Sequence, residues 1–158
     1  MWKKIKPYVY SIIIALAVGF LSAMLTSGSM EAYRSISKPP LNPPMAVFPI
    51  VWSVLFILMG ISSALIFTKR NEDKTKAYSA LKTYGLQLAV NFFWSIIFFN
   101  MQAYLFAFIW LLLLLALIII MIIQFKRICP LSAYLQIPYL LWVAFAGYLN
   151  LMIYILNR

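Results

Sequence analysis

The residues in the middle of the apolar runs of this 158-residue chain that can do chemistry are aromatic rings, carboxamides and hydroxyls. The chain has no histidine, and its three acidic residues, Glu31, Glu72 and Asp73, lie between the runs. General acid–base catalysis needs a positioned group that exchanges a proton near neutral pH. The sequence therefore argues against a conventional enzyme and favours binding, or photochemistry that involves indole rings.

Three runs each gather such side chains on one helical face. The faces are Gln87, Asn91, Trp94, Ser95 and Phe98; Tyr139, Trp142, Ala146, Leu149 and Asn150; and Trp52, Phe56 and Gly60. Carboxamides should not face lipid, so the first face is expected to point into a bundle of helices, either as interhelical hydrogen bonds or as a pocket wall. Trp142 beside the small Ala146 would leave a slot for a flat molecule.

The elements that must position these residues are long apolar helices. Hydrophobic residues make up 65% of the chain and the mean hydropathy is +0.95, far above the roughly 45–50% of a soluble domain. The expected spans are 8–27, 46–68, 77–99, 103–125 and 131–156, each long enough to cross about 30 Å of hydrocarbon. We therefore predict an all-α integral membrane protein with one domain, 1–158, built as a bundle of five transmembrane helices.

The net charge of +10 follows the expected topology rather than a nucleic-acid site. Ten basic residues fall on one side of the predicted spans and three on the other. The ten are Lys3, Lys4, Lys6, Lys69, Arg70, Lys74, Lys76, Lys82, Lys126 and Arg127, and the three are Arg34, Lys38 and Arg158. Short basic loops stay in the cytoplasm, so we expect the N-terminus inside and the C-terminus outside.

The first run also resembles a signal peptide in its basic start. Its apolar part is about 19 residues long, against 7–15 for a signal peptide, so a membrane helix is the preferred interpretation. Cys129 is the only cysteine, which permits neither an intrachain disulfide nor a cysteine metal cage, and no metal site is expected.

The segment 28–45 is the one connection long enough to hold structure of its own. Four prolines stiffen it, and it is either a rigid connector or a lid over the bundle. The very short connections 100–102 and 126–130 predict antiparallel neighbours among the last three spans. Pro138 is expected to kink the last span.

Small residues at four-residue spacing, Ala15, Gly19 and Ala23, form a ridge on the first predicted helix. Such a ridge allows close approach of another helix. The contact is either internal or the seam of a homodimer.

Three sequence blocks resemble the TspO/MBR family, also called translocator protein, peripheral benzodiazepine receptor or tryptophan-rich sensory protein, in its bacterial form. The first block is Lys38–Pro44 (KPPLNPP) followed by Val47–Ser53 (VFPIVWS). The second is Gln87–Ser95 (QLAVNFFWS), and the third is Pro138–Ala146 (PYLLWVAFA) continuing to Leu149 and Asn150. They occur in the family's order along a five-helix layout.

The resemblance implies a homodimeric membrane receptor or sensor that binds porphyrins such as protoporphyrin IX, and lipophilic aromatic drugs, in a pocket inside the bundle. The residues it assigns to the pocket are Tyr33 (as part of the lid), Trp52, Phe56, Asn91, Trp94, Ser95, Trp142 and Ala146. It also implies light-dependent porphyrin degradation that depends on Trp52 and Trp142. No obligatory cofactor is implied, and the expected location is a bacterial cell membrane.

One position departs from the family. The family usually has Trp between the two proline pairs, where this chain has Leu41, and Ser where it has Pro40. Leucine cannot stack on a macrocycle as an indole does, which places the lid's contribution to porphyrin contact in doubt. The porphyrin propionates need cations, and Arg34 and Lys38 are the expected partners.

Facilitated transport of small lipophilic molecules or tetrapyrroles is the alternative function. Coupled transporters usually carry an ionisable group inside the membrane, and the middles of these spans carry none. Proton-driven transport is therefore disfavoured, and facilitated passage remains open.

Overall fold

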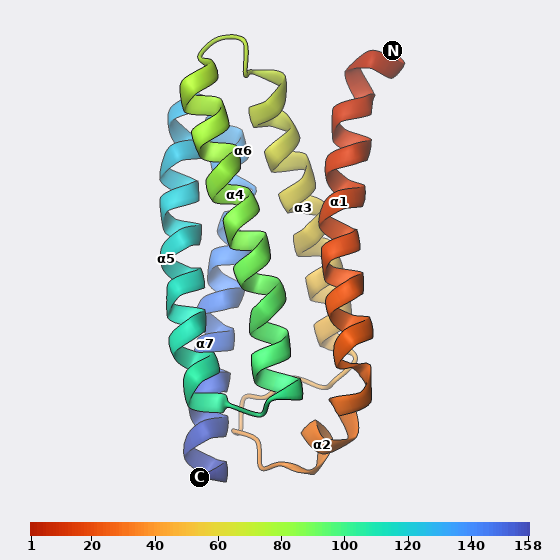
Figure 1. Ribbon diagram of the computed structural model, residues 1–158, viewed down its shortest axis with the longest axis vertical. Helices are drawn as coiled ribbons and strands as arrows, with labels where there is room; N and C mark the ends of the chain where they lie inside the picture. Colours follow the sequence, from red (N-terminus) through yellow and green to blue (C-terminus); the bar gives the residue numbers. More distant parts are fainter.

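The computed structural model describes all residues, 1–158, as an all-helical bundle without strands (Figure 1). The elements are α1 (Trp2–Thr26), the 3-10 turn η1 (Ser27–Ser29), α2 (Met30–Ser35), α3 (Val47–Thr68), α4 (Lys74–Ser95), the π-helical η2 (Ile96–Asn100), α5 (Tyr104–Ile128), α6 (Pro130–Tyr134) and α7 (Ile137–Asn157). Five rods run the length of the bundle: α1, α3, α4 with η2, α5, and α6 with α7.

Four of these rods are long and apolar enough to cross a membrane. The fifth, α4, runs alongside α5 for the same length, but it contains Lys82, Gln87 and Asn91 and is less hydrophobic. Both carboxamides of α4 are buried in the bundle, as predicted, so these two amides do not contact lipid. The protein is a five-helix membrane bundle, which confirms the predicted fold class.

The order of the rods around the bundle follows from their closest contacts. α1 packs on α3, α3 on α6, α6 and α7 on α5, and α5 on α4, and α4 closes the ring against both α1 and α3. The short turns make α4, α5 and α7 neighbours, as expected. α3 packs closely on α6 but has little backbone contact with α7, so the two helices separate along α7. A groove lies in this gap.

Close approach of α1 and α3 depends on small residues. A Cβ atom on Gly60 would lie 2.5 Å from the Cα atom of Ile12, and one on Gly19 would lie 2.5 Å from a ring carbon of Phe56. Ala15 is fully buried at the same contact. Ala15 and Gly19 of the small-residue ridge on α1 therefore pack against α3 of the same chain, so this part of the ridge forms an internal helix contact.

The last predicted span is not one helix. The expected helix over 131–156 breaks after Tyr134 and restarts at Ile137, and Pro138 lies in the first turn of α7 instead of kinking a continuous helix. Proline lacks the N–H that a helix interior needs, whereas the first turn of a helix tolerates its absence. The prediction of an internal kink was wrong for this reason.

Other helix bounds differ from the prediction by a few residues. α1 begins at Trp2 instead of residue 8, because the basic N-terminal segment is helical as well. α4 begins at Lys74, where the side chain of Asp73 accepts a hydrogen bond from the backbone N–H of Lys76. Its last turn is the π-helix η2, which directs Phe98 into the core.

The segment 28–45 is ordered and lies across one end of the bundle, which we call the loop end (Figure 1). The amide of Asn157 at the end of α7 fixes it, because it accepts from the backbone N–H of Ser37 at 2.9 Å and donates to the Ser37 carbonyl at 2.8 Å. The N-terminus and the α3–α4 turn lie at the opposite end, the turn end. The ten basic residues grouped from the sequence lie at or near the turn end.

We expect Gly60→Ala to destabilise the bundle, because the added methyl group meets the backbone of α1 at Ile12. Overpacking of this kind costs about 1–3 kcal/mol. The measurement is the thermal unfolding midpoint in detergent. Gly85→Ala is the matched control, since a Cβ atom there meets nothing within 4 Å and should leave the midpoint unchanged or raise it. Equal midpoints for the two variants would contradict the close α1–α3 contact.

Candidate ligand-binding site

A buried hydrogen-bond chain joins α4 to α7 at the centre of the bundle. The amide nitrogen of Asn91 donates to the hydroxyl of Tyr139 at 2.8 Å, and that hydroxyl donates to the amide oxygen of Gln87. The amide nitrogen of Gln87 is 3.8 Å from the sulfur of Met59 on α3. Gln87 and Asn91 on the polar face of α4 therefore form interhelical hydrogen bonds. This is one of the two roles that the sequence left open for this face, the other being a pocket wall.

A second polar contact lies nearer the loop end. The indole N–H of Trp94 donates to the side-chain oxygen of Asn150 at 3.1 Å, and the amide nitrogen of Asn150 donates to the carbonyl of Tyr104 at 2.8 Å. Asn150 thus connects α4, α5 and α7. Trp94 also stacks on Phe98, with ring centroids 5.2 Å apart. The indole N–H of Trp94 thus has a hydrogen-bond partner, and its ring packs on Phe98 and Phe99.

Aromatic rings of α3 extend this centre. Trp52 stacks on Phe56 with centroids 5.6 Å apart, and its edge meets Tyr139 at 6.3 Å. Phe56 in turn packs against Gly19 of α1. Trp52 and Asn91, which come from two different helices, therefore both contact Tyr139, and Phe56 joins them through Trp52.

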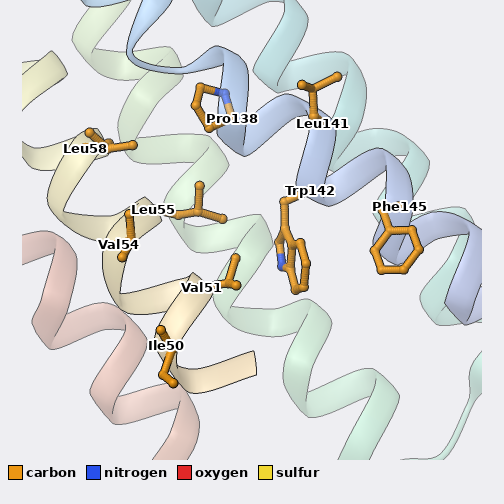
Figure 2. A pocket seen from close by; sticks show the side chains of 9 residues that line it. All are labelled: Ile50, Val51, Val54, Leu55, Leu58, Pro138, Leu141, Trp142 and Phe145. Atoms are coloured by element: carbon orange, nitrogen blue, oxygen red, sulfur yellow. The ribbon is translucent and has the colours of Figure 1, made fainter. Parts of the chain in front are cut away.

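Trp142 faces the gap between α3 and α7, where the groove has a volume of about 490 Å³ (Figure 2). The groove is lined by Ile50, Val51, Val54, Leu55, Leu58, Pro138, Leu141, Trp142 and Phe145. Figure 2 shows the indole of Trp142 projecting from α7 towards Val51 of α3. Its N–H is buried and has no hydrogen-bond partner, and its ring contacts Phe48 and Phe145 at 5.9 and 5.7 Å.

The loop end adds a tyrosine and two cations. Tyr33 on α2 is buried, and its ring lies 5.2 Å from that of Phe99. The ammonium of Lys38 lies 4.8 Å above the Tyr33 ring and donates to the carbonyls of Arg34 and Ile36. Arg34 is exposed, and its Nε donates to the sulfur of Met45. Neither cation has a carboxylate partner.

The predicted site residues thus fall into three groups. Trp52 and Asn91 contact Tyr139, with Phe56 stacked on Trp52. Trp94 and Tyr33 belong to the aromatic cluster near the loop end, and Trp142 lines the groove. Ser95 and Ala146 are half-buried, and the hydroxyl of Ser95 makes no hydrogen bond. No aromatic contact joins Trp52 directly to Trp142.

Sequence reasoning missed the residues that connect these groups. Phe48 packs on Trp142 from the first turn of α3, and Asn157 holds the loop. Neither carries a signal in the sequence, because an apolar ring at a helix start and an amide at a chain end are both common. Tyr139 was placed on the correct face by its spacing, but its central position depends on the register between α4 and α7.

The fold and site define a class: an integral membrane bundle of five helices with buried carboxamides at its centre and a lateral apolar groove beside the indole of Trp142. A family model described as the TspO/MBR family matches residues 11–156. The chain belongs to the TspO/MBR family.

Relatives extend over most of the chain. It is 36% identical to the tryptophan-rich protein TspO of Chlorobaculum tepidum, covering 99% of each chain. It is 34% identical to the protein CrtK of Rhodobacter capsulatus over 94% of this chain and 91% of that one. Identity to the translocator protein of Bos taurus is 34% over 84% of this chain and 79% of that one. These relatives support a membrane role of the sensor or transporter kind.

Tyr139→Phe should destabilise the bundle, because it leaves the Asn91 amide nitrogen and the Gln87 amide oxygen without their shared partner. An unpaired buried polar group costs about 1–3 kcal/mol. The thermal unfolding midpoint in detergent measures the effect. Tyr134→Phe removes the same atom from an exposed ring and is the control. A midpoint unchanged by Tyr139→Phe would show that the hydrogen-bond chain does not stabilise the fold.

Proposed function

We propose that this protein binds a porphyrin, such as protoporphyrin IX, or another flat lipophilic molecule beside Trp142, where α3 and α7 separate. The single observation that carries the proposal is a lateral apolar groove beside the indole of Trp142, whose buried N–H has no hydrogen-bond partner. Ligand pockets combine apolar walls with a few placed polar groups and have volumes of about 300–1,000 Å³. The groove, at about 490 Å³, lies in this range.

The groove suits the macrocycle for two reasons. Its walls are aliphatic and aromatic, so a flat apolar ring gains burial and stacking area there. The buried N–H of Trp142 lacks a partner, and a ligand acceptor that reaches it by displacing neighbouring side chains would satisfy it. A bound macrocycle would separate Trp142 from Phe48 and approach Trp52 on the inner side of α3.

The cations at the loop end orient the ligand in this proposal. Protoporphyrin carries two propionates, and the lining of the groove carries no positive charge. Arg34 and Lys38 have no carboxylate partner to displace. The macrocycle would therefore lie among the rings with its propionates towards the loop end.

The proposal includes light-dependent degradation of the bound porphyrin. None of the residues around the groove is a general acid or base, so oxidation of the excited macrocycle by dioxygen is the available chemistry. Trp142 lines the groove, and Trp52 is the next residue after Val51 of its lining, so these two indoles are the proposed electron-exchange partners of the ligand. Their part would be photochemical and would leave binding in the dark largely intact.

We further infer a bacterial cell membrane as the location, with the N-terminus in the cytoplasm, because the ten basic residues lie at or near the turn end and three lie elsewhere. A homodimer remains part of the proposal. With Ala15 and Gly19 packed against α3, its seam would need other residues.

Replacing both Trp52 and Trp142 by Phe should keep protoporphyrin binding in the dark within about threefold and abolish the light-dependent loss of its absorbance. The phenyl rings preserve most of the apolar contact but not the indole redox chemistry. The measurement is porphyrin absorbance under illumination in air, compared with darkness. Trp110→Phe is the control, because that indole donates to the carbonyl of Val90 away from the groove. Degradation at the original rate would exclude the photochemical role.

Arg34→Ala combined with Lys38→Ala should weaken protoporphyrin binding by about tenfold, since an exposed ion pair contributes up to about 1 kcal/mol. The porphyrin dimethyl ester, which has no propionate charge, should bind both forms equally. Lys126→Ala with Arg127→Ala removes the same charge at the turn end and should have no effect. Unchanged affinity of the loop-end variant would show that the propionates point elsewhere.

A further inference from the structure

A second groove lies on the first turns of α4, apart from the aromatic site. It has a volume of about 400 Å³ and is lined by Lys74, Thr75, Tyr78, Ser79 and Lys82. All five residues are exposed. Their spacing of one, three, one and three residues places them on one face of the helix. The groove is therefore a continuous polar strip near the turn end.

The strip is a set of hydrogen-bond donors with a net positive charge. Lys74 and Lys82 supply two ammonium groups, and the other three residues supply hydroxyls that can donate. The one salt bridge of the structure joins Lys76 to Asp73 at 3.7 Å, so no carboxylate neutralises Lys74 or Lys82. Two free cations flanking three hydroxyls are complementary to an oxyanion such as a phosphate.

The same face of α4 becomes apolar beyond Lys82. Leu86, Ala89 and Phe93 continue it at spacings of four, three and four residues, and all three are exposed. From Lys82 to Phe93 the helix rises about 16 Å at 1.5 Å per residue. This length is about half of the roughly 30 Å hydrocarbon core, which is the depth of one leaflet. The face thus has a cationic head and an apolar tail of the dimensions of a lipid.

We propose that this face of α4 binds one anionic phospholipid, with its phosphate between Lys74 and Lys82 and an acyl chain along Leu86 and Phe93. A zwitterionic lipid carries its own cation, which two ammonium groups would repel, so a headgroup with net negative charge fits better. The basic residues gathered towards the turn end attract such lipids to this leaflet. The proposal does not depend on the porphyrin site.

A second copy of the chain is a poorer occupant for this face. Two copies in one membrane share their orientation, so a two-fold axis along the membrane normal brings the same residues of both copies together. Lys82 would then face Lys82 at the same depth, without an acidic partner on either side. Like charges at such a contact are destabilising, which disfavours a dimer seam at the cationic end of α4.

The test compares lipids bound to the full chain after extraction from membranes that hold equal amounts of phosphatidylglycerol and phosphatidylcholine. Native mass spectrometry gives the ratio of the two bound lipids. Lys74→Gln combined with Lys82→Gln should lower the preference for phosphatidylglycerol about tenfold or more, because one basic residue near an anionic surface contributes roughly fivefold. Both residues are exposed, so the thermal unfolding midpoint should not change.

Lys126→Gln with Arg127→Gln is the matched control, since these exposed residues close α5 at the turn end. The control should keep the preference within about twofold. Equal losses in the two variants would mean unspecific attraction to a basic surface, and no loss in the α4 variant would place the lipid elsewhere. Displacement of the lipid by inorganic phosphate at the same concentration, or a change in oligomeric state of the α4 variant, would also overturn the proposal.

Discussion

A polar group inside a bilayer must find its partner within the protein, and this requirement decides how the bundle is assembled. This requirement applies most strongly to α4, because it contains the carboxamides of Gln87 and Asn91 in the middle of its length. Both amides meet one hydroxyl, that of Tyr139, so a single side chain of α7 fixes the rotation of α4 and the register of the two helices. The remaining helices close around this pair.

The contact between α1 and α3 differs in kind from the hydrogen-bonded contact between α4 and α7. There, close packing replaces hydrogen bonding, and Gly60 and Gly19 allow backbone and ring to come within contact distance. α3 is thus held on one side by α1 and at the turn end by α6. Along α7 it has no comparable partner, which is the reason that the lateral groove lies between α3 and α7 and that Trp142 is the residue beside it.

Two features of the groove follow from this geometry. It lies on the side of the bundle, within the apolar region, so a ligand would reach it from the membrane. It is also next to the buried centre, because Tyr139 and Trp142 are neighbours on one turn of α7. A ligand in the groove would therefore act on the same helix that fixes α4, which offers a physical route from binding to a change in helix packing.

The break before α7 contributes to the same geometry. Pro138 forces the chain to restart its helix at Ile137, so α6 can pack on α3 while α7 takes its own path along α5. The sequence predicted that Pro138 interrupts the regular helix, but it did not predict that the interruption is a break between two helices. A kink and a break both accommodate the missing N–H of Pro138, and the choice between them depends on the contacts that α6 and α7 make with different neighbours.

The amino-acid sequence by itself determined the membrane class, the approximate helix bounds and the inward orientation of Gln87 and Asn91, since these depend on hydropathy and helical spacing. It could not assign faces within uniform stretches: among the leucines of α5, Leu111 is buried and Leu112 is exposed, although they are chemically identical. Only the tertiary structure decided which rings meet, where α3 and α7 separate, and that Asn157 holds Ser37 across 120 residues of chain. Such contacts depend on the relative rotation and register of helices, which no local pattern encodes.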